Sequence, residues 1–157
     1  MTNECESCIA TIDRNGFQYG TSLKRLGEAI GKTPEEMATL IRISVAEYDE
    51  REAFEGELNM VLNLAELSKL SSVLGIHTRL LFDGENLNAQ LVSTHELMTK
   101  IRACLNSTCA SVSEFEDRVG FKIEKSLSDP FEILKWNVDC LRFVCKETGV
   151  DWRLALP

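Results

Sequence analysis

The sequence has little that would suggest a strand-rich or membrane-spanning protein. Only 7% of the residues are aromatic, and alternating runs of β-branched residues are scarce, so helices are favoured over strands. No stretch approaches the roughly 18 apolar residues that indicate a membrane-spanning helix. The N-terminal residues show no basic start followed by an apolar run, so we expect no signal peptide. We therefore expect an all-α protein of the cytoplasm that does not enter a membrane.

Basic residues are also fewer than acidic ones. The chain has 17 lysines and arginines against 25 aspartates and glutamates, which gives a formal net charge of −8. Phosphate contacts need local positive charge, so this balance counts against a generic nucleic-acid binder. With 157 residues and 44% hydrophobic content, the chain has ample material for a core, in one domain or in two small ones.

No pattern of catalytic or metal-binding residues stands out. The sequence has no glycine-rich phosphate loop, no G-x-S-x-G and no H-E-x-x-H, and its two histidines, His77 and His95, are far apart. Six cysteines in a chain without an export signal are expected to be reduced thiols. Cys5 and Cys8 form one CxxC, but a metal site would need two further ligands at compatible spacing. Candidates for these ligands are the Cx4C pairs Cys104/Cys109 and Cys140/Cys145, a spacing that on helices mostly places two small apolar residues on one face. We expect no enzyme, no metal and no cofactor.

The chain is organised around residues 33–43, TPEEMATLIRI. Thr33 and Glu36 form a capping box with Pro34 at the first helical position, which predicts the start of a helix. A second capping box, Ser44 with Glu47, follows almost at once. Two short helices joined by so tight a turn predict a helix-turn-helix, whose second helix is normally the one offered to the DNA major groove.

Regular helical patterns lie on both sides of this motif. One face carries Leu23, Leu26 and Ile30 before Gly31, and a long amphipathic stretch from Met60 to Leu74 ends at Gly75. The same plan recurs in the second half, with a capping box at Ser111 and Glu114 and an amphipathic stretch that ends at Gly149. The first copy is longer by a small insertion around Ala53 to Leu58. We predict an N-terminal arm (1–19), a first domain (20–83), a linker (84–93) and a second, divergent domain (94–157).

The hydrophobic spacing, the capping and the Leu74-Gly75-Ile76 ending resemble the phage-repressor and Cro type of helix-turn-helix domain over roughly residues 20–82. The second half is similar but more divergent. The resemblance implies two small helical bundles of helix-turn-helix type, and a homodimer that binds a two-fold operator as a transcriptional regulator. By position, the resemblance places DNA-contacting residues at Ser44, Glu47 and Arg51 in the first half and at Arg118, Lys122, Lys125 and Ser126 in the second. Lys24, Arg25 and Lys32 are further candidates for phosphate contacts, or ordinary surface charges.

A second hypothesis rests on the acidity of the first recognition helix. Asp49, Glu50 and further carboxylates up to Glu57 have only Arg51 as a basic neighbour, and carboxylates beside phosphates repel a duplex. The alternative is a protein-interaction module that does not bind DNA, of antitoxin, immunity or anti-repressor type, whose acidic helix docks a basic partner. Trp136 and Trp152 are expected to fill the core, although an exposed Trp152 would be a candidate anchor for a partner.

Overall fold

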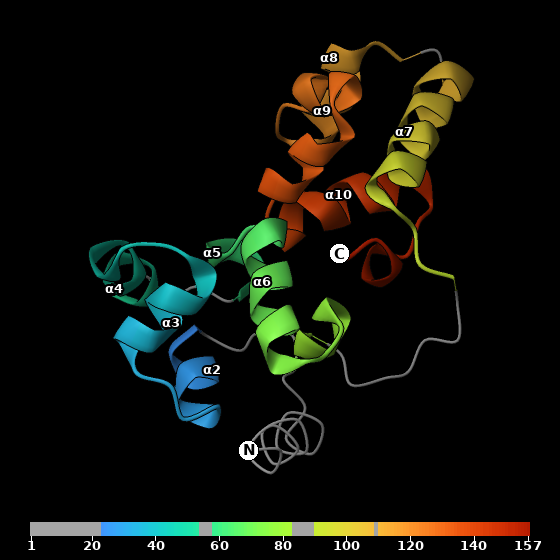
Figure 1. Cartoon of the computed structure of the whole chain (residues 1–157). Helices are drawn as coiled ribbons and strands as arrows, with labels where there is room; N and C mark the ends of the chain where they lie inside the picture. The colour runs from blue at the N-terminus through green and yellow to red at the C-terminus, as the bar shows by residue number, and fades with distance from the viewer. Residues whose placement is uncertain (1–22, 54–57, 83–89, 109) are drawn as a thin grey trace. The chain divides into compact units, whose positions relative to one another are not determined.

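The computed structural model describes residues 23–53, 58–82, 90–108 and 110–157, all in helices, turns or loops, so the prediction of an all-α fold is confirmed (Figure 1). The chain forms two compact units, residues 1–86 with Pro157 and residues 87–156. The predicted N-terminal arm with its CxxC, most of the predicted linker and Cys109 lie outside the described residues. No helix in the described residues is long and apolar enough to cross a membrane.

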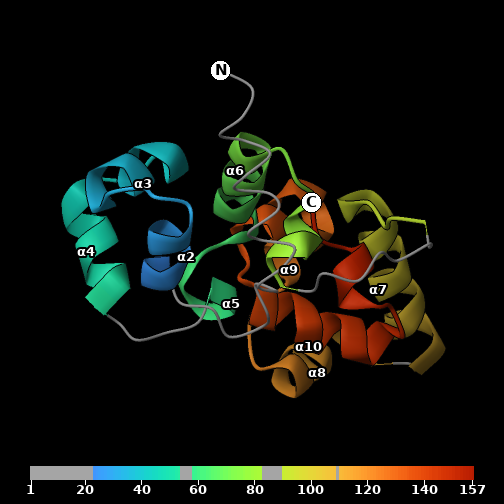
Figure 2. The ribbon, with the colours of Figure 1, turned by 90° about the horizontal axis from the view of Figure 1, so that it is seen from below.

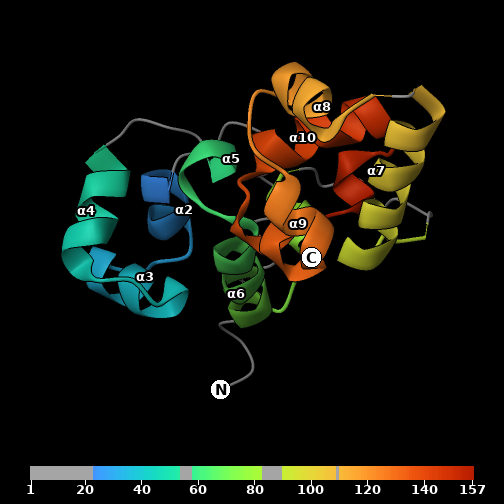
Figure 3. The same ribbon diagram turned by 90° about the horizontal axis from the view of Figure 1, so that it is seen from above.

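In the described part of the first unit, α3 and α4 pack against each other. Helix α3 packs against α4 and α6, and α2 contacts α4, as Figures 2 and 3 also show. The core contains fully buried leucines from α2, α5, α6 and η1 together with Met37, Ile41 and Tyr48. The described helices are α2 (Leu23–Ala29), α3 (Pro34–Ile41), α4 (Val45–Ala53), α5 (Leu58–Val61), α6 (Leu64–Leu74) and the 3-10 helix η1 (Thr78–Leu81).

The second unit is built around its last long helix. Helix α10 packs against α7 and α8, while α7 also contacts α9 and η2 (Figure 3). Phe115, Ile123, Ile133 and Leu141 are completely buried in its core. Its helices are α7 (Thr94–Thr108), α8 (Val112–Val119), α9 (Glu124–Ser128), η2 (Pro130–Lys135), α10 (Val138–Thr148) and η3 (Trp152–Leu154).

Corresponding residues cap corresponding helices in the two units. The predicted boxes at Thr33 and at Ser111 are both present, each with the side chain accepting from the amide three residues on and the glutamate accepting from the cap amide. In this way four amides and four oxygens at two exposed helix starts are satisfied locally. Farther along, one offset of 74 residues relates Asn63 to Asn137 at the starts of α6 and α10, Gly75 to Gly149 at their ends, and His77 to Asp151 at the starts of η1 and η3.

The first unit is four residues longer between its capping sites. Thirty positions separate Thr33 from Asn63, whereas 26 separate Ser111 from Asn137. The insertion expected around Ala53 to Leu58 falls largely on residues 54–57, outside the described residues. Among the described elements, α4 has nine residues, whereas α9 at the corresponding place in the second unit has five.

The turn after α3 has an arginine where the corresponding turn of the second unit has a glycine. This difference predicts that a glycine would stabilise the first turn. Arg42 ends α3 in the left-handed conformation with φ of 61°, and Gly120 occupies the same position after α8 with φ of 84°. A left-handed conformation costs a non-glycine residue about 1 kcal/mol. We expect Arg42→Gly to raise the free energy of unfolding by about 1 kcal/mol and Gly120→Ala to lower it by a similar amount, measured by urea unfolding. A loss of stability in Arg42→Gly would show that the arginine side chain stabilises the turn.

Candidate functional site

The candidate recognition helix of the first unit, α4, is anchored in the core by one large side chain. Tyr48 is 1% exposed, and its hydroxyl lies with the side chain of Met37 against Gly27 of α2. Burial raises the pKa of the Tyr48 hydroxyl to about 12, so this anchor stays neutral at ordinary pH. Ser44 caps the helix, since its hydroxyl accepts from the Glu47 amide at 3.1 Å. The turn over residues 42–44 and the buried tyrosine thus fix how α4 is presented.

The outward face of α4 carries carboxylates. Glu47, Asp49 and Glu50 are all exposed, next to exposed Val45 and Ala46. The resemblance to helix-turn-helix domains implied a base-reading pair at Ser44 and Glu47 of this face. Ser44, however, is occupied as a cap, and the carboxylates around it present negative charge to anything that approaches this face.

The only basic residue of α4, Arg51, is bound within the unit. Its guanidinium contacts Glu47 Oε1 at 2.6 Å and Glu66 Oε2 at 2.7 Å, and it donates to the Val61 carbonyl at 3.3 Å. Glu66 is 7% exposed, and the same Oε2 accepts from the Asn63 amide at the start of α6. A buried carboxylate needs such a partner, because removing it from water without one is costly. Arg51 thus joins α4 to α6 instead of pointing outward as the resemblance implies.

A buried carboxylate also organises the turn of the second unit. Glu116 of α8 is 6% exposed. Its Oε1 accepts from the amides of Ile123 and Glu124 at 2.8 and 3.2 Å, and its Oε2 contacts Lys122 Nζ at 2.8 Å. The hydrogen bond from Lys122 and those from the two amides lower the pKa of Glu116 despite its burial. Glu116 therefore takes the place of a side-chain cap at the start of α9, where the N-cap residue Ile123 has no side-chain cap hydrogen bond.

The four second-unit residues implied to contact DNA have different environments. Lys125 and the Lys122 side chain are exposed, the latter by 80% although its amine contacts Glu116. Arg118 lies 3.6 Å from Glu147 and over the Phe115 ring at 5.6 Å. Ser126 is 2% exposed, so in this unit its hydroxyl is enclosed and out of reach of a nucleic acid. Of these four residues, Lys122, Lys125 and Arg118 are therefore exposed and Ser126 is buried.

The structure also shows where the remaining basic residues considered for phosphate contacts and the described thiols lie. Lys24 and Arg25 are exposed on α2, and Lys32 lies 3.7 Å from Glu36. Cys104, Cys140 and Cys145 are free thiols. Burial raises the pKa of Cys140, and that of Cys145 to about 12, so neither is an activated nucleophile. Among the residues that the structure describes, no group of three or more metal-ligating side chains comes together.

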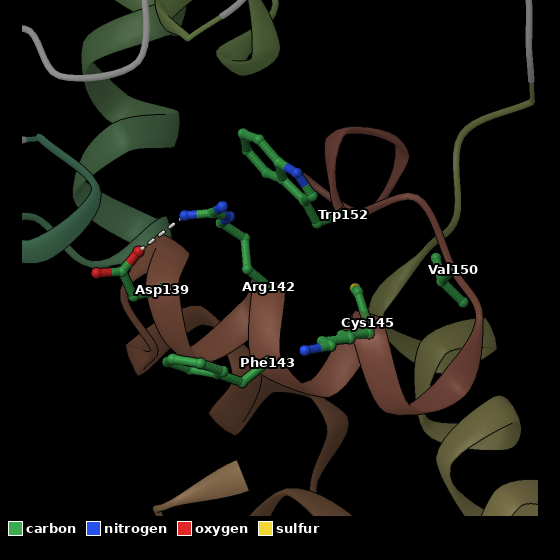
Figure 4. Close-up of a pocket in the computed structure, with 7 residues that line it drawn as sticks. Asp139, Arg142, Phe143, Cys145, Val150 and Trp152 are labelled. Carbon is green, nitrogen blue, oxygen red and sulfur yellow. Dashed lines mark hydrogen bonds and ion pairs between the residues drawn. The ribbon is translucent and has the colours of Figure 1, made fainter.

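A groove runs along the outward side of α10 in the second unit (Figure 4). Its volume is about 430 Å³. Trp152, from η3, lies beside the Arg142 guanidinium, 5.6 Å from it, and Arg142 in turn contacts Asp139 at 3.4 Å. Trp136, in contrast, is 8% exposed and packs edge-on against Phe121 with ring centroids 5.2 Å apart. Of the two tryptophans, therefore, Trp136 belongs to the core and Trp152 to the groove.

Sequence reasoning missed the two buried glutamates and the groove. Glu66 carried a local signal, because Asn63-x-x-Glu66 has the form of a capping box. Glu116 and the groove carried none, since they depend on residues brought together by folding.

Comparison with family models, curated proteins and solved structures finds no match to this chain.

Proposed function

We propose that this chain is a cytoplasmic protein-interaction module on a repressor-like helix-turn-helix scaffold, and that α4 docks a basic surface of a partner protein. The observation that carries the proposal is the state of Arg51. The one cation of α4 is bound to Glu47 and Glu66, which leaves Asp49 and Glu50 exposed without a compensating charge on their helix. Roles of the antitoxin, immunity or anti-repressor kind fit such a surface.

Electrostatics supports a protein partner over a duplex. A phosphate backbone repels exposed carboxylates, whereas a lysine- or arginine-rich surface is attracted and steered by them. Exposed Val45, 41% accessible, adds an apolar contact at the start of the same helix. A helix held by buried Tyr48 and by the Arg51 bridge is presented with little freedom, which lowers the entropic cost of docking.

The test is binding of a fluorescein-labelled decalysine peptide, measured by anisotropy at two salt concentrations. We expect Asp49→Asn/Glu50→Gln to weaken binding about tenfold, a loss of about 1.4 kcal/mol. The matched control is Asp117→Asn/Glu124→Gln, which makes the same charge change at exposed positions of the second unit. We expect the control to weaken binding less than about twofold, because neither residue belongs to the proposed docking helix, whose charges make the complementary contacts. Equal losses in both variants would mean that only net charge matters and would remove α4 from the proposal.

The second candidate function is a DNA-binding regulator that uses the second unit. It is favoured by exposed Lys122 and Lys125 around α9 and by the turn between α8 and α9. As a homodimer, two such units would face two half-sites of an operator. Against this stand the contact of Lys122 with Glu116 and the short length of α9, which ends at Ser128.

A further inference from the structure

The groove on α10 is formed by the face of the helix that is turned away from its core. Asp139, Arg142, Phe143 and Lys146 follow one another at steps of three, one and three, which places them on a single stripe. Leu141 and Val144 are buried on the opposite side, whereas Cys145, although buried, also lines the groove. Phe143 is 54% exposed, and Trp152 and Val150 from the segment after α10 complete the lining. An exposed aromatic beside a second aromatic and two cations is unusual on a face that takes no part in the core.

The residues that line the groove are not shared with the corresponding positions of the first unit. The 74-residue offset that relates α6 to α10 matches Arg142 with Ser68, Phe143 with Lys69 and Trp152 with Thr78. Thr78 is 1% exposed and hydrogen-bonds Ser71 at 2.8 Å, so in the first unit a small side chain at this position serves the packing. Only the second unit has the large aromatic and the cations, although both units form the same capped helix and the same following turn.

We propose that this groove binds a small aromatic anion, a flat ring that carries a carboxylate, sulfonate or phosphate. Its volume of about 430 Å³ lies within the usual range for small-ligand sites. Arg142 is already turned toward the Trp152 ring, with its guanidinium carbon 5.6 Å from the centroid, and Asp139 fixes it from the other side. Lys146, one helical turn after Arg142, is exposed.

The side chains that line the groove can bind both the ring and the anionic group of such a ligand. Rings pack favourably against the faces and edges of Trp152 and Phe143, and an anion gains charge-assisted contacts from Lys146 and Arg142. The chain as a whole carries a net charge of −8, so its overall charge does not attract an anion. The inference is independent of the role of α4, because none of its residues belongs to the first unit.

The probe for the test is 1-anilinonaphthalene-8-sulfonate, an aromatic sulfonate, titrated into the full-length protein. Its binding is followed by its own fluorescence and by quenching of tryptophan emission. We expect Phe143→Ala and Lys146→Ala each to weaken its affinity by about fivefold to tenfold, since each loses a contact of the order of 1 kcal/mol. The matched controls are Phe131→Ala, the other exposed phenylalanine of the second unit at 71%, and Lys125→Ala. Both controls should bind the probe as the unmodified chain does.

Two comparisons distinguish a defined binding site from nonspecific binding to an exposed apolar surface. N-phenyl-1-naphthylamine has the same rings without the sulfonate, and we expect it to bind at least about tenfold more weakly if the cations contribute as charge-assisted contacts do. Trp152→Phe should abolish most of the tryptophan quenching, because Trp136 lies in the core. Equal binding of the neutral probe, an equal effect of Phe131→Ala and Phe143→Ala, or no binding of the sulfonate up to millimolar concentration would each overturn the proposal.

Discussion

Replacing Glu116 with alanine is expected to lower the free energy of unfolding of the second unit by about 3 kcal/mol, since buried donors that lose their acceptor cost roughly 1–3 kcal/mol each. The carboxylate accepts from the amides of Ile123 and Glu124, and the Ile123 amide is enclosed. Alanine provides no acceptor, and the start of α9 would lose the group that takes the place of a side-chain cap. The measurement is urea unfolding followed by tryptophan fluorescence, which reports this unit because both tryptophans, Trp136 and Trp152, lie in it.

Glu116→Gln is the matched control for this prediction. Glutamine keeps one oxygen for the two amides but loses the charge that faces Lys122, so its destabilisation should be clearly smaller. The pKa of Glu116 is lowered in the folded state, so its stabilising charge is fully present above the pKa of the unfolded chain. That contribution is lost as the pH falls through the lowered folded-state pKa. The difference between the unmodified chain and Glu116→Gln should therefore shrink in acid, and a constant difference would contradict the assignment.

Replacing Arg51 with alanine is expected to destabilise the first unit by about 2–3 kcal/mol, somewhat below the cost of breaking a fully buried pair because Arg51 is partly exposed. The change leaves the buried Glu66 carboxylate with the Asn63 amide but without its cation. It also removes the link between α4 and α6. Hydrogen exchange of peptides from α4 and α6 should show faster exchange, while peptides from α10 should be unchanged, as expected for a site confined to one unit.

Arg51→Lys separates the geometry of this bridge from its charge. A lysine amine is a compact point charge, whereas the arginine fork reaches Glu47 and Glu66 with different nitrogens at 2.6 and 2.7 Å. We expect Arg51→Lys to recover only part of the lost stability. If Arg51→Ala left the stability unchanged and removed binding to DNA, Arg51 would be a base-reading residue and the structural role given to it here would be wrong.

The local features of the fold could be predicted from the sequence because their causes are local. The capping boxes at Thr33 and Ser111 depend on residues three positions apart, and both are present. The helix ends at Gly75 and Gly149 likewise follow from one residue that accepts a left-handed conformation. Helical periodicity and capping residues therefore predict most of the secondary structure.

The candidate sites could not be predicted in the same way, because they depend on contacts distant in sequence. The sequence alone predicts Arg51 to be a surface cation, whereas in the fold it contacts Glu66, 15 residues away. Ser126 has the residue type of a DNA contact, but its position in the short α9 buries it. The groove joins α10 to the η3 segment, and no motif indicates that Trp152 faces Arg142.

The most direct test of the account is a fluorescence-anisotropy titration of the full-length chain with fragmented genomic DNA, including the promoter of its own gene, at low and at moderate salt. A protein-interaction module with an acidic α4 should show no binding to any fragment even at low salt, where phosphate contacts are strongest. Tight binding to a subset of fragments that weakens steeply with salt, and that is lost in Lys122→Ala/Lys125→Ala, would contradict the proposal and establish the regulator.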